Sequence, residues 1–263
     1  MNTVSFAEGP RDVPVMILLG ILWLGWAALL FGGFLLGKST ADDARRMPVW
    51  ARLGSSFVLV GAAWAMAFFA SEEMQTARGL IALGMTLGAV GDIAMARRPP
   101  RVVAGMALFG LGHIAYIAGF ANIISAHDIA AQVSGIATTS MQMSLLPLIV
   151  LVLVSAATWF LVVYRPTKQR GALRLMTLPY GLLLACTAGI AFAAGDAYAD
   201  LHGLLRYLPA LGAILFLLSD LLLAAELFNR ARTRGIETGD AIWLLYGPGQ
   251  MLIVYASLVL TIM

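Results

Sequence analysis

Eight long apolar runs, separated by short polar loops, dominate the 263-residue sequence. A helix that crosses a bilayer needs ~20 mostly apolar residues. A soluble domain cannot bury that much apolar surface, since 60% of the chain is apolar and only 12% is charged. A transmembrane barrel would instead alternate apolar and polar residues over ~10-residue segments. The sequence therefore predicts an all-α transmembrane bundle of eight helices, over Val13–Leu36, Val49–Ala70, Gly79–Ala96, Val102–Ile124, Met141–Tyr164, Leu173–Ala194, Leu204–Phe228 and Ala241–Met263.

The basic residues predict how this bundle lies in the membrane. All but three of the 17 Lys and Arg residues follow the first, third, fifth and seventh runs, the exceptions being Arg11, Arg78 and Arg206. Cytoplasmic loops are enriched in Lys and Arg, so we expect these four loops in the cytoplasm and both termini outside. Residues 1–12 are expected to form an extracytoplasmic segment without the features of a cleaved signal. Residues 13–263 then form a single multi-pass domain, in the inner (cytoplasmic) membrane if the host is bacterial.

Charge and cysteine content argue against several classes of protein. The net charge of +3 comes from the loop clusters that topology already explains, so we expect no nucleic-acid partner. Cys186 is the single cysteine, so one chain can form neither a disulfide nor a Cys-based zinc site. Zinc prefers histidine and thiolate ligands, and magnesium or calcium needs several oxygen ligands. We therefore predict no metal and no cofactor.

Ionisable side chains inside the apolar runs are the strongest functional signal. Each costs at least ~2.5–3.5 kcal/mol on insertion scales and usually marks function. The four are Asp92, His113, Asp220 and Glu226. Glu226 lies four residues before Arg230, and we attribute it to an i,i+4 ion pair. By helical rise, Asp92 lies roughly 7 Å and Asp220 about 15 Å inside the predicted cytoplasmic boundary.

Other polar side chains occupy the same half of the membrane. Tyr180, Tyr246 and Gln250 all lie within the cytoplasmic half of their predicted helices. A single shared pocket would give every one of these buried polar groups a partner. The alternative is that each aspartate is satisfied separately and only fixes helix packing. His127 and His202 fall in predicted external loops and carry no functional signal.

The two halves of the chain also resemble each other. The stretches around Asp92 and Asp220 both run from outside to inside, and Leu108–His113 matches Leu245–Gln250 in residue type. We interpret helices one to four and five to eight as a possible 4+4 parallel repeat, related by an axis along the membrane normal. Such an axis would bring the two aspartates to opposite walls of one cavity.

Several motifs carry a resemblance to a known family. They are Gly91-Asp92-x-x-Met95, Phe109-x-x-Gly112-His113-x-x-Tyr116-x-x-x-Phe120, Gly212-Ala213-x-Leu215-Phe216-x-x-Ser219-Asp220-x-x-Leu223-Ala224 with Phe228, and Tyr246-x-x-x-Gln250. In this order, and with Tyr180 in the sixth helix, the chain resembles the YhhN or lysoplasmalogenase family of polytopic membrane proteins. It departs from the family pattern in two places. Arg45-Arg46-Met47-Pro48 stands where a Lys-Pro pair is common, and Pro248 interrupts the last motif.

The resemblance implies an ether hydrolase with paired aspartates. The family's activity is hydrolysis of the vinyl (1-alkenyl) ether bond of lysoplasmalogens to a fatty aldehyde and a glycerophospho-alcohol. Protonation of the β-carbon gives an oxocarbenium ion, and two carboxyl groups can serve such chemistry. We expect Asp220, deeper and surrounded by leucines, to be the acid and Asp92 the ionised partner, although the pair could share one proton.

The remaining polar side chains are expected to bind the substrate. We predict that they hold glycerol or phosphate oxygens, or the water: His113, Tyr116, Tyr180, Ser219, Tyr246 and Gln250. The partners we expect are a lysophospholipid substrate and membrane lipids, whereas the sequence specifies neither headgroup, chain length nor oligomeric state. A proton-coupled transporter and a non-catalytic lysolipid-binding membrane protein are the alternatives, because buried carboxylates between helical repeats also serve carriers.

Overall fold

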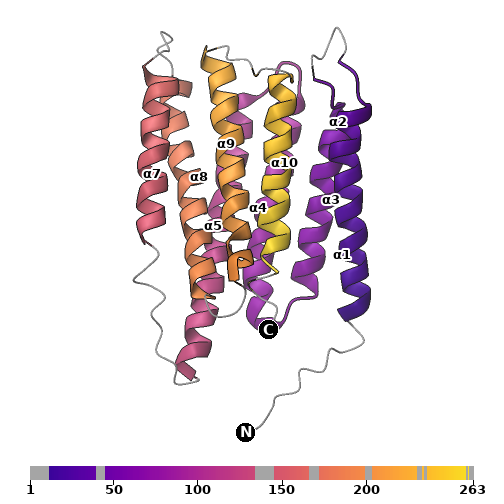
Figure 1. Cartoon of the computed structure of the whole chain (residues 1–263), viewed down its shortest axis with the longest axis vertical. Helices are drawn as coiled ribbons and strands as arrows, with labels where there is room; N and C mark the ends of the chain where they lie inside the picture. The colour runs from indigo at the N-terminus through magenta and orange to yellow at the C-terminus, as the bar shows by residue number, and fades with distance from the viewer. Residues whose placement is uncertain are drawn as a thin grey trace.

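The helices of this protein stand side by side along one axis, as the computed structural model shows (Figure 1). The structure describes residues 12–39, 45–133, 145–165, 172–198, 203–229, 233, 236–258 and 260, and these residues contain no β-strand. The elements are α1 (Asp12–Ala27), η1 (Ala28–Gly32), α2 (Gly33–Leu36), α3 (Val49–Phe68), α4 (Glu72–Ala96), α5 (Val102–Val133), α7 (Leu145–Trp159), η2 (Phe160–Tyr164), α8 (Ala172–Ala197), η3 (Gly203–Tyr207), α9 (Leu208–Asn229) and α10 (Thr238–Ala256).

Over the residues that the structure describes, the predicted all-α bundle of eight helices is confirmed. The segments α1, η1 and α2 follow one another without a break and form the first helix, and η3 leads directly into α9. Seven segments of the described chain are long and apolar enough to cross a membrane, and α10 is not among them. Helix α10 nevertheless packs on α9, α3 and α4 and runs along the same axis as the others (Figure 1).

The helix ends follow from local sequence chemistry. Pro48 is extended before α3 and fixes the entry into that helix. Glu72 and Glu73 lie in the first turn of α4, where their negative charge complements the helix dipole. Helix α10 continues through Pro248, so the proline that departs from the family pattern does not end this helix.

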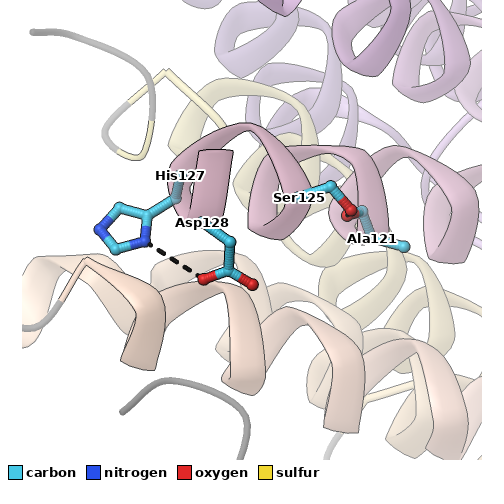
Figure 2. A network of polar contacts seen from close by, with 4 residues as sticks. All are labelled: Ala121, Ser125, His127 and Asp128. Atoms are coloured by element: carbon cyan, nitrogen blue, oxygen red, sulfur yellow. Dashed lines mark hydrogen bonds and ion pairs between the residues drawn. The ribbon is translucent and has the colours of Figure 1, made fainter. Parts of the chain in front are cut away.

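Two helices extend beyond their predicted apolar runs. Helix α4 begins at Glu72 rather than Gly79, and α5 continues to Val133 rather than ending at Ile124. His127 therefore lies on α5, and its predicted place in a loop is wrong. Figure 2 shows His127 beside Asp128, with its Nδ1 3.8 Å from the Asp128 carboxylate. The apolar count missed this part of α5 because polar residues outside the hydrocarbon still continue a helix.

Pairs of glycines bring neighbouring helices into backbone contact. A Cβ added to Gly84 in α4 would lie 2.8 Å from the carbonyl oxygen of Gly112 in α5. In the second half of the chain, a Cβ on Gly212 in α9 would lie 2.6 Å from the carbonyl oxygen of Gly249 in α10. Small residues permit such close approach of transmembrane helices.

The glycine contacts of the two halves of the chain correspond in position. Gly84 and Gly212 each lie two turns before the aspartate of their helix, and Gly112 and Gly249 each precede the matched residues His113 and Gln250. In addition, α1 and α7 each end in a five-residue π-helix, η1 and η2. The 4+4 repeat stays a prediction.

The first helix starts and the last helix ends at the same end of the bundle (Figure 1). An even number of helices requires this arrangement. The predicted N-terminal segment, residues 1–12, lies outside the described residues except for Asp12. The orientation of this end toward the extracytoplasmic side stays a prediction.

Substitution of Gly212 tests the close packing of α9 on α10. We expect Gly212→Ala to destabilise the protein by about 1–3 kcal/mol, because the new methyl group meets backbone atoms that cannot move independently. Gly61→Ala in α3 is the control, since nothing lies within 4 Å of its Cβ position. Thermal unfolding in detergent measures both, and equal stability of the two variants would contradict the packing described.

Candidate functional site

A cavity of about 350 Å³ opens at the end of the bundle where α3 and α10 begin. Asp92 of α4 and Asp220 of α9 both line it, together with the aromatic side chains Phe109, Trp243 and Tyr246. Its remaining lining residues are Arg45, Val49, Arg52, Leu53, Met95, Ala96, Pro100, Val102, Leu223, Glu226, Leu227, Gly239 and Ile242. The two aspartates, far apart in sequence, therefore face one space.

Asp92 accepts two hydroxyl hydrogen bonds on one carboxylate oxygen. Ser56 of α3 donates to Oδ2 at 2.6 Å, and Tyr246 of α10 donates to the same oxygen at 2.9 Å. The Asp92 side chain is only 3% exposed. Hydrogen bonds to an ionised acceptor are stronger than neutral ones, so this environment stabilises a carboxylate and joins three helices through it.

A chain of hydrogen bonds continues from Asp92 away from the cavity. The amide nitrogen of Gln250 donates to the hydroxyl oxygen of Tyr246 at 3.3 Å, and Tyr116 donates to Gln250 Oε1 at 2.6 Å. Tyr116 and Gln250 are almost completely buried and do not line the cavity. Their contacts hold the Tyr246 hydroxyl in place for Asp92.

Asp220 occupies a different environment. Tyr180 of α8 donates a short hydrogen bond to its Oδ2, and the hydroxyl of Ser219 lies 3.4 Å from its Oδ1. Ser219 is itself buried and donates at 2.7 Å to the carbonyl oxygen of Phe216. The side chain of Asp220 is partly exposed, so the expectation that leucines enclose it more than Asp92 is wrong. Residue spacing places Asp220 further along its helix from the cytoplasmic boundary, but its side chain lies at the open cavity.

His113 lies apart from both aspartates. Its Nδ1 is 2.9 Å from the hydroxyl of Thr187, whose own proton goes to the carbonyl oxygen of Leu183. The ring packs edge-on against Phe216 at a centroid distance of 4.4 Å, and it does not line the cavity. Among the described residues, no group of three His, Cys, Asp or Glu side chains lies together as metal ligands would.

Two arginines bring positive charge to the cavity. Arg45 and Arg52 line it, whereas Arg97, Arg98 and Arg101, in the loop after α4, do not. Arg52 is 3% exposed and stacks over the Trp243 ring at 5.7 Å. The topology prediction counted Arg52 among the loop cations, although Arg52 lies on the inner face of α3.

Asp240 fixes the segment that carries Arg45. Its two carboxylate oxygens accept hydrogen bonds from the backbone N–H groups of Arg46 and Met47, at 2.7 and 3.1 Å. Asp240 is fully buried in the first turn of α10. The wall of the cavity near Arg45 therefore depends on a contact between the segment before α3 and the first turn of α10.

The predicted site residues form two groups in the structure. Asp92, Asp220 and Tyr246 share the cavity, and Tyr180 joins them through Asp220. Tyr116, Gln250, Ser219 and His113 lie behind its wall. Sequence reasoning missed Ser56, Arg52 and Asp240, and it set Glu226 aside although this residue lines the cavity. The expected partner of Glu226, Arg230, lies outside the described residues.

Removal of the Asp240 carboxylate tests this contact. We expect Asp240→Ala to increase amide hydrogen exchange at Arg46 and Met47 and to cost about 1.5–3 kcal/mol of stability, because two buried N–H groups lose a charged acceptor. Glu237→Ala is the matched control, since Glu237 precedes α10 without a capping hydrogen bond from its side chain. Unchanged exchange in the Asp240 variant would contradict the assigned role.

Comparisons with known proteins agree with the motifs of the site. No curated protein and no solved structure matches the sequence. The family model described as the YhhN family matches residues 50–257, which include α3 to α10 and both aspartates. The match extends over more than half of the chain, and the chain therefore belongs to the YhhN family.

Proposed function

We propose that this protein hydrolyses the vinyl ether bond of lysoplasmalogens, releasing a fatty aldehyde and a glycerophospho-alcohol. The observation that carries the proposal is that Asp92 and Asp220 line one cavity and differ in their surroundings. Asp92 is enclosed and accepts hydrogen bonds from two hydroxyl groups, whereas Asp220 is open to the cavity. Two carboxyl groups in unlike environments are suited to divide the roles of acid and base.

In this mechanism Asp220 is the general acid. It transfers a proton to the β-carbon of the vinyl ether, and the oxygen-bearing carbon becomes part of an oxocarbenium ion. Tyr180 donates to Oδ2 of Asp220, so Oδ1 carries the proton that is transferred. The contact with Tyr180 orients the carboxyl group, which supports efficient transfer from a fixed donor.

Asp92 acts as the ionised partner. Its negative charge stabilises the oxocarbenium ion, and its carboxylate accepts a proton as water adds to the cationic carbon. The resulting hemiacetal collapses: its hydroxyl proton passes to Asp220, its hydroxyl oxygen becomes the aldehyde oxygen, and the glycerol oxygen leaves with the proton that Asp92 had accepted. Both aspartates thus return to their starting states, and one vinyl ether and one water are converted to one aldehyde and one alcohol.

Arg45 and Arg52 are suited to bind the phosphate of the substrate. Guanidinium groups bind phosphate through paired hydrogen bonds, and both arginines line the cavity that holds the aspartates. Tyr116 and Gln250 act as positioning residues, because they reach Asp92 only through Tyr246.

Substitution of the aspartates tests the proposal. We expect Asp92→Asn and Asp220→Asn each to lower aldehyde release from a lysoplasmalogen by about 100-fold or more, because general acid–base catalysis contributes 10²–10⁴-fold. Aldehyde detection by mass spectrometry with purified protein measures this, and size-exclusion chromatography in detergent checks folding. A folded variant with near-normal turnover would remove that aspartate from the mechanism.

A saturated substrate analogue tests the type of reaction. We expect the 1-alkyl ether analogue of a lysoplasmalogen to compete with the substrate without being cleaved, since it has no double bond to protonate. Cleavage of the analogue would contradict a vinyl ether mechanism. Accumulation of intact lysoplasmalogen inside proteoliposomes, with no aldehyde formed, would instead favour the transporter.

A further inference from the structure

A second, smaller cavity adjoins the one that holds both aspartates. It measures about 60 Å³ and lies among α5, α7, α8 and α9, which pack against one another in the bundle (Figure 1). The two cavities share part of their walls, including Asp220, Phe109 and Met95. Asp220 therefore stands at the boundary between them.

The polar atoms that line the smaller cavity are occupied by bonds within the protein. Ser155 donates to the carbonyl oxygen of Gly181 at 2.9 Å. Thr177 donates to the carbonyl oxygen of Arg174 at 2.7 Å and accepts the indole N–H of Trp159 at 2.9 Å. Tyr180 donates to Asp220. Apart from Asp220, this wall offers no hydroxyl or indole proton to a ligand, and Met106, Leu184, Leu221 and Phe228 make the rest of it apolar.

The larger cavity has the opposite character. Arg45, Arg52 and Glu226 bring charge to its wall, and none of them lines the smaller cavity. An amphiphile that spans both spaces thus has only one favourable direction, because burying a charged group without a partner is costly. Its head lies near the arginines and its chain lies among α5, α7, α8 and α9.

We infer that the smaller cavity binds the first few carbons of the hydrocarbon chain of the lysolipid substrate, directly beyond Asp220, since about 60 Å³ has room for only a few methylene groups. This inference rests on the proposed function and specifies how the substrate is oriented. In a lysoplasmalogen the vinyl ether joins the polar glycerol to the chain, so this orientation brings the double bond to the boundary at which Asp220 stands. The inferred chain site therefore explains why Asp220, rather than the more enclosed Asp92, is the group that meets the β-carbon.

Ala224 offers a direct way to obstruct the chain site. It lies one turn after Asp220 on the same face of α9 and lines only the smaller cavity. We expect Ala224→Phe to lower kcat/KM for a substrate of about 16 carbons at least about tenfold relative to the 1-ethenyl analogue, whose chain ends at the double bond, since discrimination by an apolar pocket reaches 10–200-fold. Ala225→Phe is the control, because Ala225 is the next residue along α9 and lines neither cavity.

A photoreactive probe tests the same site in the unaltered protein. The probe is a 1-alkyl lysophosphatidylcholine with a diazirine on the third carbon of its chain, and it cannot be hydrolysed as a vinyl ether. We expect its cross-links, mapped by mass spectrometry, at Met106, Trp159 or Val163, and we expect excess unlabelled alkyl lysolipid to suppress them.

The outcomes separate the chain site from the proposed function. Cross-links at Val49, Leu53 or Ile242, which line only the larger cavity, would overturn the inferred orientation. Equal suppression by a diacyl phosphatidylcholine would identify a general lipid contact and also overturn it. Cross-links in the smaller cavity without any aldehyde release from lysoplasmalogen would retain the chain site and reject the proposed hydrolysis. An equal loss of activity on long and short substrates in a folded Ala224→Phe variant would contradict chain binding there.

Discussion

A carboxyl group inside a membrane-spanning bundle needs hydrogen-bond donors, and the arrangement of this bundle around its cavity follows from that need. Asp92 obtains its donors from Ser56, on the preceding helix α3, and from Tyr246, on the distant helix α10. The second aspartate obtains its donor from Tyr180 on α8. The two carboxyl groups therefore tie α3, α4, α8, α9 and α10 together around one cavity, and the same contacts that stabilise these helices give the two groups different surroundings.

The contrast between the two cavities gives this site a direction. Apart from Asp220, the charged side chains of the site, such as Arg52, line only the larger cavity, while the smaller one presents apolar side chains and hydroxyl groups whose protons are already engaged. Between them, Asp220 faces both. A polar lipid bound here would be ordered along the site by its own amphiphilic character, so the protein needs few specific contacts to select which bond meets the acid.

Sequence reasoning located the bundle and the depth of its polar groups, because helical rise converts residue spacing directly into distance along the axis. It could not determine the rotation of each helix about that axis. His113 and Tyr246 both fall in the predicted cytoplasmic half of the membrane, yet His113 faces Thr187 and Phe216 while Tyr246 faces Asp92. For the same reason Arg52 was counted with the loop cations, since a residue near a helix end carries no sequence signal that distinguishes an inward from an outward face. Asp240 was missed because its partners are backbone N–H groups, which no motif records.

Helix α10 supplies both Tyr246, which binds Asp92, and Asp240, which holds the backbone beside Arg45. Over its described residues, it is also the one helix of the bundle that is absent from the segments long and apolar enough to cross a membrane. In the chain α10 follows α3, α4 and α9, so a ribosome synthesises it after them. During biogenesis the nascent protein accordingly holds Asp92 without the Tyr246 hydroxyl until α10 has been made, and a product truncated before residue 238 would lack the assembled site even if its preceding helices were inserted correctly.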